Sequence, residues 1–137
     1  MAVLVLDSEA VLCLARPHQN ELRLRRVRAA LRSAHRMNAA VRIPSVVLVE
    51  LYRGPRHDEP IDALLGRGIA QVITTGSRVA RIAGHLLAAA EAGSELAVDA
   101  VVLATAVRLG GGIVATHDPA DLERLAAPIN NVSILAI

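Results

Sequence analysis

Short apolar runs alternate with longer amphipathic segments along the chain, and this alternation constrains the fold more than any other feature. Residues 2–6 are wholly apolar, which is typical of a strand buried on both faces of a sheet. The other predicted strands cover residues 41–44, 69–73, 113–116 and 132–137. Strands that alternate with helices predict an α/β domain with a central, mostly parallel five-stranded sheet.

Helices are predicted between these strands. They cover residues 9–15, 18–37, 46–52, 61–66, 77–92, 98–109 and 119–126. Ser8 and Ser45 are expected to cap the first and third helices, because serine oxygens accept hydrogen bonds from free N–H groups at helix starts. Residues 55–60 are expected to form a loop, and the glycines at 110–112 to end a helix.

Length and composition narrow the class of protein. The 137 residues fit one domain, residues 1–137. Hydrophobic residues make up 53% of the chain, but they include only one Tyr and no Phe or Trp. A base-stacking platform for single-stranded nucleic acid is therefore disfavoured. No apolar run reaches the roughly 18–20 residues that span a bilayer, and Cys13 has no partner for an internal disulfide. We expect a cytoplasmic protein with no membrane partner.

All fifteen basic residues are arginines, and the net charge is only +2. Arginine binds phosphate through two parallel hydrogen bonds, so a polyanionic substrate is compatible with this composition but not required by it. Four arginines form a stripe on the predicted helix 18–37, namely Arg25, Arg28, Arg32 and Arg36. The stripe either guides RNA through its phosphates or is an ordinary solvated helix face.

Two acidic residues follow predicted strands, and two others interrupt apolar segments. Asp7 comes directly after the first strand, and Asp118 lies two residues after the fourth, so both are expected at the carboxyl edge of the sheet, where α/β proteins bind ligands. Glu50 and Asp99 lie in SVVLVELY and ELAVDAVVLATAV, where an inward-facing charge is costly without a partner. Taken singly, each acid also fits a helix cap or a solvent-facing position.

Taken together, the four acids favour a metal site. Carboxylates that converge repel one another unless a cation lies between them. Oxygen ligands without a Cys or His cluster favour Mg²⁺ or Mn²⁺ over zinc. A carboxylate site of this kind is suited to hydrolysis of phosphodiester bonds. His117, beside Asp118, is expected either to contact substrate phosphate or to face solvent.

Four segments carry a resemblance to a known family. They are VLVLDSEAV at 3–11, ELYRG at 50–54, VDAVVLATA at 98–106 and ATHDPADL at 115–122. In this order the chain resembles the PIN-domain family over nearly its whole length, and in particular the VapC-type toxin ribonucleases. The resemblance implies a three-layer α/β/α fold and Mg²⁺- or Mn²⁺-dependent cleavage of RNA that leaves 5′-phosphate and 3′-hydroxyl ends. It also implies a homodimer that a small antitoxin holds inactive.

The resemblance further implies roles for individual residues. Asp7 and Asp99 match the family's principal metal-binding aspartates, and Glu50 matches an acid that helps hold metal or orient water. Asp118 matches the fourth acid, and Thr116 the hydroxyl residue two places before it.

Three further positions are less constant in the family or have a secondary role. Asp121 matches an additional acid, and Ser8 is expected to act as a cap that also hydrogen-bonds metal-bound water. Leu122 stands where the family usually has an aromatic residue, which leaves the packing at that position in question.

Other functions fit the sequence less well. A phospho-acceptor receiver domain needs a lysine near the later strands and an aspartate at the end of the third, but the chain has no lysine and has Thr74-Thr75 there. A PIN fold that binds without cleaving remains an alternative, although all four acids are present. Larger PIN nucleases that cut DNA or flap structures carry helical insertions for which 137 residues leave no room.

Overall fold

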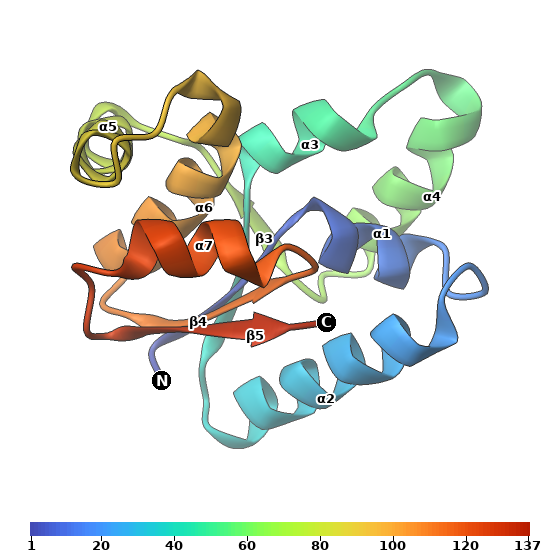
Figure 1. Ribbon diagram of the computed structural model, residues 1–137. Coiled ribbons are helices and arrows are strands. Elements are labelled where there is room, and N and C mark those ends of the chain that lie inside the picture. Colours follow the sequence, from blue (N-terminus) through green and yellow to red (C-terminus); the bar gives the residue numbers. More distant parts are fainter.

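A five-stranded parallel sheet forms the centre of the computed structural model, which describes residues 1–137 (Figure 1). The strands are β1 Val3–Leu6, β2 Ala40–Pro44, β3 Gln71–Ile73, β4 Gly112–Thr116 and β5 Val132–Ala136. Their order is β3-β2-β1-β4-β5, and every neighbouring pair is parallel. The predicted α/β class is confirmed, and each strand begins and ends within two residues of its prediction.

The central position of β1 explains its wholly apolar sequence. It lies between β2 and β4, and all four of its residues are buried. Gly112 begins β4 beside Val3, with φ at +152°, and a Cβ at this glycine would collide with the Val3 backbone. A residue with a side chain is therefore excluded at this point of contact between the two strands.

Helices cover both faces of the sheet. They are α1 Ser8–Ala15, α2 Glu21–Arg36, α3 Ser45–Leu51, α4 Pro55–Gly66, α5 Ser77–Ala89, α6 Ala97–Arg108 and α7 Pro119–Ala126, with a 3₁₀ turn at Ser94–Leu96. In Figure 1, α2 lies below the sheet against β1 and β2, whereas α6 and α7 lie above it. This is the expected three-layer arrangement. None of the helices is both long enough and apolar enough to cross a membrane.

The predicted caps of α1 and α3 were wrong by one residue. Asp7 caps α1, because its Oδ1 accepts a hydrogen bond from the N–H of Ala10 at 2.9 Å, and Ser8 is the first helical residue. Ser45 is likewise the first residue of α3, and Pro44 before it offers no side-chain cap. Asp7 alone therefore separates β1 from α1, and α3 follows β2 directly.

The predicted loop 55–60 was also wrong, because it forms the first half of α4. Pro55 is at the first helical position, where its fixed φ favours a helix and its missing N–H is no loss. Pro60 lies inside the helix and cannot donate to the carbonyl of Arg56, four residues earlier. The Arg16 guanidinium donates to that carbonyl instead, at 3.3 Å.

Two other helix boundaries differ from their predicted positions by three residues. Asn20 caps α2 through the N–H of Arg23, so the helix begins at Glu21 and not at residue 18. The helix predicted to reach Ala92 ends at Ala89.

Leu122 is fully buried in a continuous apolar core, so an aliphatic side chain is accommodated where the family usually has an aromatic one.

Candidate active site

The carboxyl ends of β1 and β4 bring Asp7 and Asp118 to one edge of the sheet. The two strands are neighbours, with Leu6 paired to Ala115. Asp7 directly follows β1, and its backbone N–H donates to the Ala115 carbonyl at 3.2 Å. The His117 N–H, from the turn after β4, donates to Asp7 Oδ2 at 3.3 Å. These two bonds hold Asp7 against the end of β4 and the turn that leads to Asp118.

Asp7 is held more rigidly than the other acids. Its side chain is buried, and its two oxygens accept separately from the N–H groups of Ala10 and His117. Burial raises the pKa of Asp7, and the bonds from Ala10, Thr116 and His117 partly offset this rise. The Thr116 hydroxyl also accepts from the Asp118 N–H at 3.0 Å, which shapes the turn after β4 that carries Asp118.

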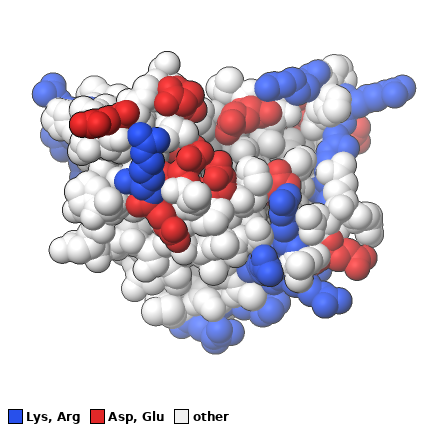
Figure 2. Space-filling view, viewed as in Figure 1, with Lys and Arg blue, Asp and Glu red and all other residues white.

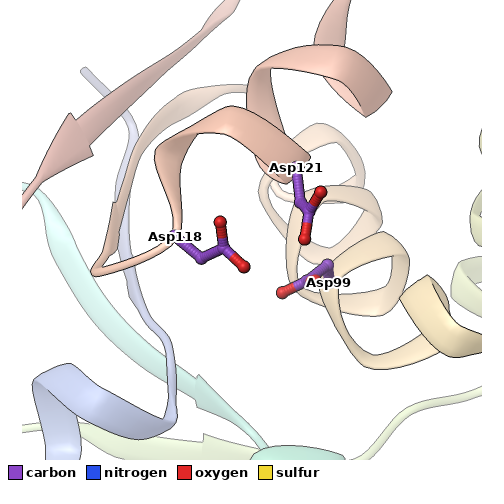
Figure 3. A group of neighbouring side chains, drawn as sticks. All are labelled: Asp99, Asp118 and Asp121. Carbon is purple, nitrogen blue, oxygen red and sulfur yellow. The ribbon is translucent and has the colours of Figure 1, made fainter.

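Three aspartates form a close cluster beside this edge. Single carboxylate oxygens of Asp99, Asp118 and Asp121 all lie within 4.8 Å of one another, and Figure 3 shows the side chains pointing toward a common centre. Asp99 and Asp121 lie in the first turns of α6 and α7, where the helix dipole favours a negative charge. Asp118 immediately precedes α7 and makes no side-chain hydrogen bond to the start of that helix.

Negative charge gathers in the cluster, and the charge of Arg124 offsets part of it at Asp121. The pKa of Asp99 rises to about 6, first because of burial and then because of the charges of Asp118, Asp121, Asp7 and Glu50. No hydrogen bond offsets this rise. The pKa of Asp121 is also raised, first by a side-chain hydrogen bond with Asp118 and then by burial and the charge of Asp118. A divalent cation among these oxygens would remove the repulsion.

The chemistry of the donors fits a hard cation. The three clustered side chains offer oxygen only, which suits Mg²⁺ or Mn²⁺. The imidazole of His117 is half exposed, with Nδ1 3.9 Å from Asp7 Oδ2, and Cys13 is buried in the core. Neither belongs to the cluster, so the donor set gives no reason to expect zinc.

The structure places the remaining predicted residues around the cluster. Glu50 lies on α3, which packs against α6, and its side chain is exposed, so it carries no cost of burial. It is close enough to raise the pKa of Asp99 but is not one of the clustered acids. Ser8 follows Asp7 in the first turn of α1. Asp121, given only a secondary role from the sequence, lies inside the cluster because it is one helical turn beyond Asp118.

Comparison with known proteins identifies the family. The profile of the PIN domain matches residues 4–128, which include every acid described above. The chain belongs to the PIN-domain family. Among curated protein sequences none matches this PIN domain significantly.

Two solved structures share this PIN fold. One is the crystal structure of VapBC2 from Rickettsia felis bound to a DNA fragment from their promoter, with a TM-score of 0.68 and 16% identity. The other is DNA-bound VapBC from Salmonella typhimurium, with a TM-score of 0.66 and 15% identity. Each alignment covers 98% of both chains. At these identities the similarity establishes the fold over the full length.

Proposed function

We propose that this PIN domain is an Mg²⁺- or Mn²⁺-dependent endoribonuclease that acts in the cytoplasm as the toxin of a toxin–antitoxin pair. The cluster of Asp99, Asp118 and Asp121 beside Asp7 is the observation that carries the proposal. Its charge is only partly offset by Arg124, and its oxygens match the preference of a hard divalent cation. PIN domains are generally nucleases, which makes a phosphodiester the expected substrate.

The acids would divide the work between metal binding and proton transfer. Asp7, Asp99 and Asp118 would hold the metal, with Asp121 adjacent, and a bound Mg²⁺ would orient the phosphate and neutralise charge that develops during hydrolysis. The two N–H bonds to Asp7 preorganise its oxygens, which limits the geometries open to the site. Glu50, exposed at the flank, would accept a proton from the attacking water.

The toxin assignment rests on the full-length similarity to chains of two VapBC structures, both bound to DNA. The proposed partners are accordingly RNA as substrate, a small antitoxin as inhibitor and a second copy of the chain. This size leaves no large insertion that would thread a DNA strand, since each alignment covers 98% of both chains.

The test uses the purified chain free of any antitoxin. Total RNA is incubated with Mg²⁺, Mn²⁺ or EDTA, and the new 5′ ends are mapped. We expect cleavage that requires the metal and is lost in Asp99→Asn, whereas Glu123→Gln, an exposed acid of α7 outside the cluster, cuts as the wild type does. Binding of RNA without cleavage in either metal would instead support a binding module and contradict the nuclease proposal.

A further inference from the structure

A groove lies at the edge of the sheet opposite to the acids. It has a volume of about 710 Å³ and is bordered by α2, the start of β2 and residues 68–72, which lead into β3. Its lining is mostly aliphatic and includes Leu31, Val41, Leu65 and Ile69. We call it the edge groove. Because it lies at the amino ends of β2 and β3, an occupant would leave the catalytic edge uncovered.

Arg42 lines the edge groove, and further arginines line two hollows next to it. Two smaller hollows, of about 340 and 400 Å³, share Leu31 with it. The smaller hollow contributes Arg28 and Arg67, and the larger one Arg32 and Arg36; together with Arg42 we call these five the rim arginines. None of them forms an ion pair, and no Asp or Glu lines these hollows. Figure 2 shows arginines gathered along the lower edge of the molecule, where α2 lies in Figure 1.

One wall of the edge groove is an open strand edge. β3 is the outermost strand and pairs only with β2. No hydrogen bond outside the sheet reaches the backbone of Gln71–Ile73, so the outward N–H and C=O groups are free. Gln71 and Val72 both line the groove. A free strand edge of this kind can accept an added strand from another chain.

From these three features we propose that the edge groove binds an extended acidic peptide segment of a partner protein, laid beside β3. Aliphatic side chains of the peptide would contact Leu31 and Ile69, and its carboxylates would pair with the rim arginines through charge-assisted hydrogen bonds. RNA fits less well, because the imidazole of His35 is the one ring in the groove on which a base could stack and phosphates gain nothing from an aliphatic floor. The inference does not depend on the nuclease proposal.

The test measures fluorescence polarisation of a labelled synthetic peptide against the full-length protein. The peptide is about ten residues long, enough to cover a short strand, and alternates Glu with Val and Leu. A matched peptide carries Lys in place of Glu. We expect the acidic peptide to bind, to weaken as salt rises, and the basic peptide not to bind.

Variants locate the site. Arg67→Glu and Arg42→Glu are each expected to weaken binding by about tenfold or more, because a charged hydrogen bond contributes about that factor. Ile69→Asp, at a side chain that is 40% exposed, should do the same by adding charge to the aliphatic wall. Arg81→Glu reverses an exposed arginine of α5 outside all the hollows and should leave binding unchanged.

Two further measurements keep the outcome decisive if a variant is unstable. Thermal melts identify any variant that fails to fold, and amide chemical shifts of the wild type should move on peptide addition at Gln71–Ile73. The proposal is overturned if the acidic peptide does not bind, if Arg81→Glu weakens it as much as Arg67→Glu, or if the shifts occur elsewhere. Binding of an RNA oligonucleotide in place of the peptide, with the same dependence on Arg67, would also overturn it.

Discussion

Asp99→Asn should stabilise the metal-free protein while removing its activity. Folding raises the pKa of Asp99 from its ordinary value of 3.8 to about 6, so the folded state holds this proton more tightly than the unfolded chain does. The favourable contribution of the protonated group is fully present below about pH 4 and is lost as the pH rises through about 6. Above that pH the ionised carboxylate destabilises the fold, whereas an amide at the same position remains neutral.

The magnitude follows from the same two pKa values. Their difference corresponds to roughly 3 kcal/mol, and because the side chain is only partly buried, screening by solvent reduces this to about 1–2 kcal/mol. For a domain of this size, such a gain raises the melting temperature by about 4–8 °C. The substitution removes no hydrogen bond that would offset this gain in stability, because none reaches the Asp99 carboxylate.

The assay is urea unfolding in EDTA at pH 8 and pH 4, with wild type, Asp99→Asn and Glu123→Gln compared. We expect Asp99→Asn to be more stable than wild type at pH 8 and equal to it near pH 4. Glu123→Gln, an exposed acid of the neighbouring helix, should match wild type at both values. A loss of stability at pH 8, or a gain of the same size at both pH values, would refute the electrostatic reasoning.

The remaining predictions concern the metal, the cap and one close contact in the sheet. Mn²⁺ at a hundredfold excess over Kd should stabilise wild type by about 2.7 kcal/mol and so raise its melting temperature, but it should not raise that of Asp118→Asn. Equal shifts in the two proteins would exclude the cluster as the metal site. Asp7→Asn should abolish cleavage yet retain the cap of α1, whereas Asp7→Ala should abolish cleavage and also lower the free energy of unfolding in urea by about 1 kcal/mol. Equal stabilities of the two variants would show that the cap contributes nothing. Gly112→Ala should destabilise the fold strongly, because its Cβ would meet the Val3 backbone. Gly84→Ala, in open space on α5, should be neutral or stabilising. Comparable melting temperatures of the two variants would contradict the close approach of β1 and β4.

Local sequence was sufficient for the elements whose neighbours impose little on them. The run at residues 2–6 predicted a buried strand, since only a strand covered on both faces has no polar position. The helix at Pro119–Ala126 was predicted with its observed bounds, because proline favours a first turn and the apolar residues repeat at helical spacing. Both are short-range effects that the chain carries wherever it folds.

The start of α4 could not be predicted in this way. Two prolines within six residues are typical of a loop, and the helix forms with a carbonyl at Arg56 that its own backbone cannot satisfy. The donor that reaches this carbonyl is Arg16, forty residues earlier in the chain. Such a contact depends on how α1 and α4 pack, which no local pattern contains.

The sequence by itself determined that this is a parallel α/β domain with Asp7 and Asp118 at one edge, because residues after parallel strands share an edge whatever the helices do. Only the tertiary structure decided which acids meet. The packing of α6 and α7 brings Asp99 and Asp121 to Asp118 and leaves Glu50 exposed at the flank. The pKa of Asp99 is likewise a property of the folded chain, because burial and the charges around it arise only when separate helices converge.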